Sequence, residues 1–339
     1  MLWGSAAFSM IPCEVMGPDE PLSRATRSET ARPAASRAGG GCDVSVVIVN
    51  YRVYDELDAC LASLGGAPGI EVIVVDHEST PGQAGRLRAR HPRVTFVMSD
   101  ANPGFAAGVN AGARLASGRH FLLLNPDTRI QPDAIPSMRD YLDRHPEIGV
   151  VGPRIVDSDG TIQQSARAFP RLLTGLAGRT SPLTRVWPGN PWSRSQLLAR
   201  AASSEPVVVD WVAGSCLMAR SEAFRAVGGF DESFFLYWED ADFCKRLAEA
   251  GWPTAYLPAA AVMHLVGRSS RHARARSIRA FHASAYRYFA RHSAGRLRLL
   301  SLPAAAALLY ARMAIKLAAL QLTGPRHAEE HPQRHTSMR

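Results

Sequence analysis

Three short apolar runs with a helical segment between the first two constrain the fold of this chain more than any other feature. The runs are VSVVIVNY (44–51), IEVIVVD (70–76) and HFLLLN (120–125), and DELDACLASL (55–64) has the apolar spacing of a helix. Strand, helix and strand in this order are typical of a βαβ unit, in which parallel strands are buried on both faces. The pattern predicts an α/β fold with a doubly wound, mostly parallel sheet and flanking helices.

The remaining chain divides into stretches of different character. RVTFVMS (93–99) reads as a further strand, residues 103–117 as a Gly/Ala-rich helix, and residues 137–155 as a helix followed by a strand. Residues 157–205 are rich in Ser, Pro, Arg and Trp, so we expect a long loop there, and a long loop inside a domain is usually functional or mobile. The domain prediction is a disordered extension (1–42), an α/β domain (43–266), a helical segment (267–322) and a disordered tail (323–339).

Composition indicates which kinds of partner and which cellular compartment fit this chain. The 339 residues carry a net charge of +9, which indicates an anionic partner: a nucleic acid, a phosphorylated substrate or an acidic membrane surface. The five cysteines form no C-x-x-C pair, so the sequence signals neither a zinc knuckle nor a disulfide framework and fits a reducing cytosol.

The C-terminal segment differs from the rest of the chain. Residues 267–298 contain many Arg residues and no Asp or Glu, and residues 299–322 are largely apolar with two charges, Arg312 and Lys316. These charges interrupt a clean membrane span, so we expect a helix in the plane of an anionic membrane surface. The alternative is that both segments pack on the domain or form a dimer contact.

Polar residues at the ends of the apolar runs are the first candidates for chemistry. In open α/β sheets, ligands bind beyond the carboxyl ends of the strands, which here carry Asn50 and Tyr51, Asp76, and Asn125 to Asp127. Pro126 keeps Asn125 extended and turns the chain, which holds Asp127 at the edge of the sheet. An ordinary N-P-D turn is an equally good interpretation of this tripeptide alone.

Two further features carry ionisable groups. Glu239, Asp240 and Asp242 follow the aromatic run FFLYW at the start of a predicted helix. Acids in a first helical turn complement the helix dipole, but a carboxylate among acids and aromatic rings can also have a raised pKa and act as a general base.

His264 ends an apolar run before Gly-Arg-Ser-Ser and is either structural or part of a site for a divalent ion and phosphate. NPGFAAGVNAGARLASG (102–118) has neither common nucleotide fingerprint.

Taken in order, seven motifs resemble the family 2 glycosyltransferases of the GT-A fold, especially the rhamnosyltransferase-like members that build bacterial surface polysaccharides. The motifs are SVVIVNYR, VIVVDHES, NPGFAAGVNAG, FLLLNPD, WVAGSCLMARSEAF, GGFDESFFLYWEDADFCKRL and VMHLVGRSS, and they span about residues 43–290. The resemblance implies an inverting, metal-dependent transferase that is cytoplasmic and peripheral at the inner face of the cell membrane. Its donor would be a nucleotide-diphosphate sugar, with dTDP-rhamnose favoured and a UDP-sugar as the alternative, and its acceptor a lipid-linked saccharide.

The resemblance also implies a role for each motif residue. Asp240, with Glu239, would be the catalytic base, and Asp127 with His264 would hold Mg²⁺ or Mn²⁺. Trp211, Gly214 and Asp242 would contact the acceptor, and Arg268 the diphosphate. The residues expected to contact the nucleotide sugar are Asn50, Tyr51, Asp76, Ser79, Asn102, Gly104, Asn110 and Asn125.

The sequence departs from the family pattern in two places and leaves other functions open. Asn125 replaces the first metal-motif acid, and D-H-E-S at 76–79 replaces D-N-x-S. A sugar nucleotidyltransferase needs a Gly-rich loop after the first strand, where VNYRVYDE has no glycine. A nucleic-acid-binding protein would use the Arg-rich segment and would need neither Asp127 nor Asp240. Because these two acids belong to the motifs of the glycosyltransferase resemblance, we expect no nucleic-acid partner. A non-catalytic sugar-binding relative is the remaining alternative, because of Asn125.

Overall fold

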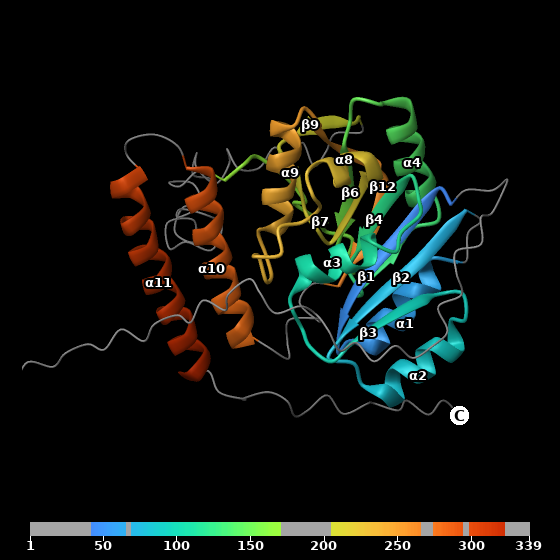
Figure 1. The fold of residues 1–339 in the computed structure, drawn as a ribbon, viewed down its shortest axis with the longest axis horizontal. Helices are drawn as coiled ribbons and strands as arrows, with labels where there is room; N and C mark the ends of the chain where they lie inside the picture. The colour runs from blue at the N-terminus through green and yellow to red at the C-terminus, as the bar shows by residue number, and fades with distance from the viewer. Residues whose placement is uncertain (1–41, 66–68, 171–204, 266–273, 294–297, 323–339) are drawn as a thin grey trace, which may run out of the picture. The chain divides into compact units, whose positions relative to one another are not determined.

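The computed structural model describes residues 42–65, 69–170, 205–265, 274–293 and 298–322. A ten-stranded sheet forms its centre (Figure 1). Eight of its strands follow the order β3-β2-β1-β4-β11-β6-β12-β5, and in addition β7 pairs with β6 and β9 with β12. The expected disordered ends of the chain and most of the expected loop at 157–205 lie outside the described residues, so the predicted domain boundaries stay predictions.

The N-terminal half of the sheet is parallel, as the apolar runs predict. Its strands are β1 (Val44–Tyr51), β2 (Ile70–His77), β3 (Thr95–Ser99) and β4 (His120–Leu124). Asn50 pairs with Asp76 in the register of β1 and β2, so the polar strand ends lie next to each other. The sequence prediction of an α/β fold with these strands is confirmed.

The second half of the sheet is mixed. β11 runs antiparallel to both β4 and β6, whereas β12 runs parallel to β6 and antiparallel to β5 and β9. β8 and β10 form a separate two-stranded sheet. The strands are β5 (Thr128–Ile130), β6 (Val150–Val156), β7 (Ile162–Gln163), β8 (Ala166–Arg167), β9 (Val207–Val209), β10 (Trp211–Val212), β11 (Cys216–Arg220) and β12 (Thr254–His264).

Helices cover both faces of the sheet and bury one core on each. One core includes buried residues of α1, α2 and α4, and the other includes those of α3, α8, α9 and α10. The helix bounds are α1 (Tyr54–Ser63), α2 (Pro81–Arg90), α3 (Phe105–Ala113), α4 (Ala134–Arg144), α8 (Ser221–Ala226) and α9 (Glu239–Glu249). The sequence prediction missed α2, because only Ala84 and Leu87 of this helix are buried and its apolar pattern is short.

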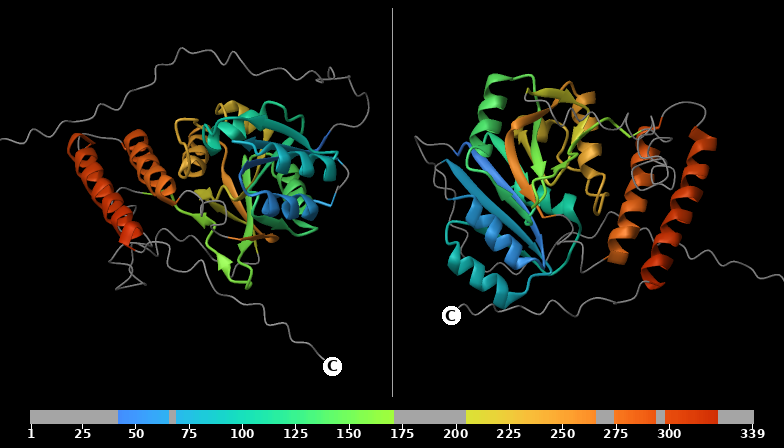
Figure 2. Two further views of the ribbon diagram at one scale, coloured as in Figure 1. Left: turned by 90° about the horizontal axis from the view of Figure 1, so that it is seen from below. Right: turned by 180° about the vertical axis from the view of Figure 1, so that it is seen from behind.

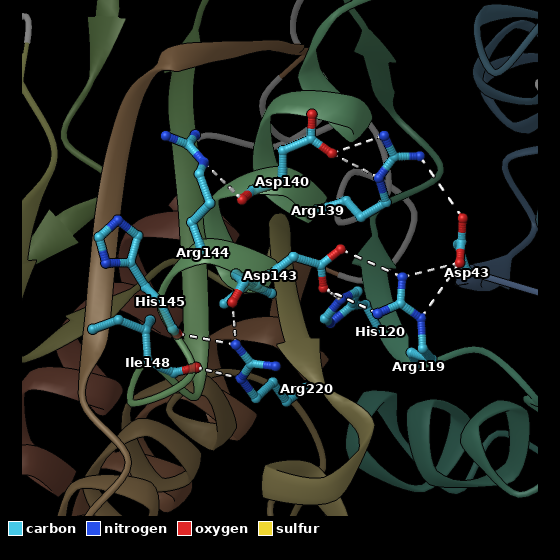
Figure 3. Close-up of polar contacts among 11 residues, drawn as sticks. Asp43, Arg119, His120, Arg139, Asp140, Asp143, Arg144, His145, Ile148 and Arg220 are labelled. Carbon is cyan, nitrogen blue, oxygen red and sulfur yellow. Dashed lines mark hydrogen bonds and ion pairs between the residues drawn. The ribbon is translucent and has the colours of Figure 1, made fainter.

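An ionic network fastens the end of the sheet opposite to the polar strand ends (Figure 3). Asp143 of α4 accepts hydrogen bonds from Arg119, at 3.1 Å, and from the buried ring of His120, at 2.9 Å, and Arg119 also pairs with Asp43. Burial alone would raise the pKa of Asp143, but the hydrogen bonds from His120 and Arg119 lower it. Arg220 of β11 donates to the carbonyls of Ile148 and His145 at 3.0 Å. The network therefore joins α4, β4 and β11 at this end of the sheet.

The C-terminal segment forms α10 (Arg274–His292) and α11 (Arg298–Leu322), which lie side by side (Figures 1 and 2). α10 packs on the domain through Tyr288, whose ring lies 5.3 Å from that of Trp238 and whose side chain is buried. Residues 301–322 of α11 are long and apolar enough to cross a membrane, with a mean hydropathy of 1.4 and 11% of the most apolar stretch buried. α10 is thus part of the domain core, whereas α11 is largely exposed.

Close packing of α3 against β1 gives a stability prediction. A Cβ atom at Gly112 of α3 would overlap the Val47 side chain, whereas a Cβ atom at Gly85 in exposed α2 would meet nothing within 4 Å. We expect Gly112→Ala to lower the free energy of unfolding by about 1–3 kcal/mol through overpacking. Gly85→Ala should raise it by about 0.4–1 kcal/mol, because alanine loses less backbone entropy in a helix. Urea unfolding of both variants measures the difference, and equal effects would contradict this packing.

Candidate functional site

The ends of β1 and β2 form a buried hydrogen-bonded cluster around Asp76. Asn50 donates to Oδ1 of Asp76 at 2.7 Å, and the hydroxyl of Tyr54 donates to Oδ2 at 3.0 Å. The backbone N–H of Thr80 donates to the Tyr54 hydroxyl at 2.7 Å, and Asp76 is 1% exposed. The cluster fixes the two strand ends and the loop after β2. Sequence reasoning missed Tyr54, although its position directly after the first strand end is a usable signal.

The loops after β1 and β2 are held in unusual backbone conformations. Arg52 and Glu78 are non-glycine residues with φ values of 58° and 48°, which L-amino acids rarely adopt. Glu78 pairs with Arg52 at 2.8 Å, and its carboxylate accepts a hydrogen bond from the hydroxyl of Tyr51 at 3.2 Å. The Ser79 hydroxyl donates to the Asp76 carbonyl at 2.7 Å. Such strained loops at the carboxyl ends of strands are typical of ligand sites.

The start of α3 approaches the aromatic loop that precedes α9. Gly104 has a φ of 109°, and a Cβ atom there would lie 2.5 Å from the carbonyl oxygen of Phe235. The backbone N–H of Phe105 donates to the same oxygen at 2.8 Å, and Asn102 accepts a hydrogen bond from the Gly104 N–H at 3.0 Å. Position 104 therefore requires glycine, because the start of α3, on the predicted nucleotide side of the site, lies against the loop before α9.

Asp127 and His264 are brought together by the pairing of β5 with β12. Oδ1 of Asp127 lies 3.4 Å from Nε2 of His264, and the backbone N–H of Leu265 donates to the Asp127 carbonyl at 2.9 Å. Asp127 is 2% exposed. The N-P-D turn is thus not an ordinary surface turn, because it holds its carboxylate in the interior beside a histidine.

The residue types of this pair fit a divalent ion. Within the described ranges, no group of three or more His, Cys, Asp or Glu side chains could hold a metal. A carboxylate oxygen and an imidazole nitrogen 3.4 Å apart nevertheless supply two donors of the kinds that Mg²⁺ and Mn²⁺ accept, and phosphate oxygens commonly complete such sites. The pair therefore fits a metal that is held jointly by the protein and a phosphorylated ligand.

Asp240 is held at the start of α9 by two backbone groups. Its Oδ2 accepts from the Gly214 N–H at 2.9 Å, and its Oδ1 accepts from the Ala241 N–H at 2.8 Å. Burial raises the pKa of Asp240, and these backbone hydrogen bonds and the charge of Arg167 oppose the rise. Burial, followed by the charge of Asp240, raises the pKa of Glu239 well above its ordinary value. The two neighbours are therefore a carboxylate pair that shares a poorly solvated environment, as in general acid–base sites.

The residues before Glu239 reach this arrangement through a strained backbone. Tyr237 and Trp238 both have a left-handed conformation, with φ values of 67° and 72°. Two consecutive non-glycine residues in this region cost on the order of 1–3 kcal/mol each and persist only where the surroundings require them. Packing of the Trp238 ring on Tyr288 and Phe289 of α10 supplies such surroundings.

The WVAGS segment links the acidic helix to the N-P-D turn. Gly214 binds Asp240, and the carbonyl of the next residue, Ser215, accepts from the Asn125 N–H at 2.9 Å. Trp211 in the same segment is 8% exposed, donates from Nε1 to the Ala168 carbonyl at 3.0 Å, and lies under the guanidinium of Arg167 at 5.0 Å. Arg167 is a second residue that sequence reasoning missed, because nothing in the sequence indicates that β8 pairs with β10.

Two predicted contact residues have structural partners instead. The Asp242 side chain is 0% exposed and accepts hydrogen bonds from Arg246 at 2.7 Å and His292 at 2.8 Å, so it anchors α10 to α9 and leaves no surface for an acceptor. Asn110 donates to the Phe230 carbonyl at 2.8 Å and accepts from the Phe230 N–H at 2.9 Å. These hydrogen bonds fasten α3 to the loop before α9. Arg268, the predicted diphosphate contact, lies outside the described residues.

Comparison with known proteins gives one consistent family. The profile of glycosyl transferase family 2 matches residues 45–200. The chain is 37% identical over 262 residues to an N-acetylglucosaminyl-diphospho-decaprenol L-rhamnosyltransferase of Mycobacterium tuberculosis, a match that covers 73% of this chain and 84% of the relative. It is 27% identical to the low-salt glycan biosynthesis hexosyltransferase Agl10 of Haloferax volcanii, over 60% of this chain and 61% of the relative.

A solved structure supports the fold. The mannosyltransferase PcManGT from Pyrobaculum calidifontis, in complex with GDP-Man and Mn²⁺, has a TM-score of 0.50 and 19% identity, with 84% of this chain and 76% of that chain covered. The seven sequence motifs, the sheet order and the rhamnosyltransferase relative thus agree. The chain belongs to glycosyl transferase family 2 and is a glycosyltransferase with the GT-A fold.

Proposed function

We propose that this protein moves a sugar, rhamnose by preference, from a nucleotide-diphosphate donor to a hydroxyl of a lipid-linked saccharide in cell-envelope glycan synthesis, with inversion at the anomeric carbon. The position of Asp240 carries the proposal, because a carboxylate with a raised pKa is held next to the WVAGS segment that also binds the N-P-D turn. The rhamnosyltransferase relative, whose name gives a diphospho-decaprenol acceptor, supports both substrate classes.

Asp240 acts as the general base in this proposal. A carboxylate has about four lone-pair positions, and the Gly214 and Ala241 N–H groups use one on each oxygen, so the carboxylate can still accept a proton from the acceptor hydroxyl. The two N–H groups also fix the direction of the carboxylate. The acceptor oxygen then attacks the anomeric carbon, and the bond from that carbon to the nucleoside diphosphate breaks on the opposite side in a single displacement, which inverts the configuration.

Asp127 and His264 would hold Mg²⁺ or Mn²⁺ with oxygens of the donor diphosphate. The ion, when bound, supplies positive charge that stabilises the departing diphosphate. Tyr51 and Ser79 would contact the nucleotide. The hydrogen bond between Asn50 and Asp76 joins the ends of β1 and β2 and so keeps the loops that carry Tyr51 and Ser79 in place. Asn125 contributes through its backbone N–H, which fixes the turn to Ser215, so the missing first acid of the metal motif leaves the turn geometry in place.

Asp240→Asn tests the base. The amide keeps the shape of the side chain but cannot accept a proton, so transfer should slow by about 10²- to 10⁴-fold while donor affinity stays unchanged. Because the base must be ionised, the wild-type rate should fall as pH falls through the pKa of Asp240, which lies above its ordinary value of 3.8. Initial rates across pH, together with donor binding by calorimetry, measure both effects.

Asp133→Asn is the matched control for this test, because Asp133 is exposed and makes no side-chain capping bond to α4. It should leave the rate and the pH profile unchanged. Near-normal turnover in Asp240→Asn would show that another group takes the proton.

Removal of the metal tests the second part of the proposal. We expect excess chelator to abolish transfer and added Mn²⁺ or Mg²⁺ to restore it. Asp127→Asn should weaken donor binding in the presence of Mn²⁺ and have little effect on it in chelator, because the lost carboxylate acts only through the ion. Calorimetric titration of the donor under both conditions gives the two affinities. Full activity in excess chelator would contradict a metal requirement.

We also propose that α11 lies on the cytoplasmic face of an anionic membrane. Along α11, the side turned inward carries the buried residues Ala305 and Leu309 and the half-buried residues Arg312 and Lys316. Among residues 301–322, whose side chains are described, the side turned outward carries no charge and exposes Leu308 to 50%, Ile315 to 70% and Leu322 to 88%. A helix that packs on a soluble domain normally turns its apolar side toward the domain and its charged side toward the solvent. Because α11 has its charged residues inside and apolar residues outside, an apolar environment is expected on its outer side.

The charge of α10 and α11 suits a bilayer as that environment. Residues 274–322 contain no Asp or Glu, and the exposed positions of α10 include Arg274, Arg279 and Arg287. Basic residues near an anionic leaflet contribute about 1 kcal/mol each, which adds to the burial of the apolar face. This position would place the site beside an acceptor that is itself held in the membrane.

Vesicle flotation tests the membrane proposal. We expect the full chain to float with anionic vesicles at low salt and less at high salt, and Ile315→Glu to reduce flotation strongly. Val208→Glu is the control, because Val208 is an equally exposed apolar residue, at 63%, on β9. Failure of the wild-type protein to bind vesicles, together with a dimer in solution that Ile315→Glu dissociates, would assign the apolar face to a second copy instead.

A further inference from the structure

Gln163, the last residue of β7, lies behind the ring of His264. Its Nε2 donates to the carbonyl of His264 at 3.0 Å and to Oδ1 of Asp157 at 2.8 Å. Its Oε1 lies 3.2 Å from Nδ1 of His264. Gln163 therefore contacts both the backbone and the ring of the histidine whose other nitrogen faces Asp127.

These partners determine the direction of every hydrogen bond in the group. The His264 carbonyl and the Asp157 carboxylate only accept, so the amide nitrogen of Gln163 must face them and its oxygen must face the ring. The reversed amide would place an oxygen against two acceptors. Since Oε1 accepts, Nδ1 of His264 must carry a proton, and in the neutral ring Nε2 then has a lone pair.

That lone pair points toward the carboxylate of Asp127. Nε2 of His264 and Oδ1 of Asp127 lie 3.4 Å apart, and neither brings a proton in this tautomer. Two electron-pair donors at this separation suit a cation bound by both. The other tautomer would place a proton on Nε2 and remove one of the two donors.

We propose that Gln163 is a positioning residue that holds His264 in the Nδ1–H tautomer, with Nε2 directed at Asp127, and so prepares this pair to bind a divalent ion. The metal part of this inference rests on the proposed function. Partners that orient a ligating histidine through its second nitrogen typically change metal affinity by about 10- to 100-fold when they are removed. Asp157 extends the effect, because it fixes the amide of Gln163.

The first measurement needs no variant of Gln163. Ring ¹⁵N spectra of the full-length wild-type protein, recorded without metal at alkaline pH, report which nitrogen carries the proton. The His264 signals are identified by their absence in His264→Gln. We expect a protonated Nδ1, and a protonated Nε2 would overturn the proposal whatever the metal does.

The second measurement compares Gln163→Met with Gln131→Met. Methionine has nearly the size of glutamine but makes no comparable hydrogen bond, and Gln131 is an exposed glutamine at the end of β5. Mn²⁺ titration followed by electron paramagnetic resonance should show affinity about 10- to 100-fold weaker in Gln163→Met and unchanged in Gln131→Met. Equal affinities in these two variants would overturn the positioning role.

Metal binding by Asp127 and His264 and the positioning role of Gln163 can be tested separately. If the wild-type protein bound no Mn²⁺ and chelator left transfer intact, the metal part of the inference and the proposed metal dependence would both fall, and the tautomer measurement would still decide the orientation of His264. If Mn²⁺ bound and transfer required it but Gln163→Met behaved as wild type, only the role of Gln163 would be lost.

Discussion

The site depends on two hydrogen bonds made by consecutive residues. The Gly214 N–H binds Asp240, and the Ser215 carbonyl binds the N–H of Asn125. These bonds join the acidic start of α9 to the N-P-D turn after β4, although the two segments are far apart in the chain. Glycine at 214 avoids a tight contact, because a Cβ atom there would lie 3.3 Å from the Cβ of Asp240. The proposed general base and the turn that carries the proposed metal-binding carboxylate are thus held by one short segment, and a single displacement at a sugar carbon needs such fixed positions.

The surrounding structure supplies rigidity at a cost in local strain. Tyr237 and Trp238 adopt left-handed conformations directly before the carboxylate pair, and the rings of α10 pack against Trp238. The buried carboxylate of Asp242 then ties α9 to α10 through Arg246 and His292. α10 therefore supports the loop before Glu239, which carries the proposed catalytic carboxylates, and also packs on α11.

Much of the fold could be predicted from the sequence, because its signals are local. Apolar runs identified β1, β2 and β4, and the register of β1 with β2 places the polar residues at their ends next to each other. Short elements were harder: α2 buries two side chains, and β7 and β8 have two residues each. Asp240 and Asp242 are both acids in the first turn of α9, so the sequence pattern did not separate them. Their side chains nevertheless point to different surroundings, because residues two positions apart in a helix do not share a face.

The sequence by itself determined the parallel half of the sheet, the family and the residues that carry charge, because periodicity and motifs are properties of adjacent residues. Only the tertiary structure decided which of those residues meet. Pairing of β5 with β12 places Asp127 beside His264, and β7 brings Gln163 behind that ring. The same holds for α11: its composition indicated an apolar helix, but packing on α10 decided that Arg312 and Lys316 turn inward and that the apolar side faces out. Contacts between distant segments depend on how the elements pack, and no local pattern records that.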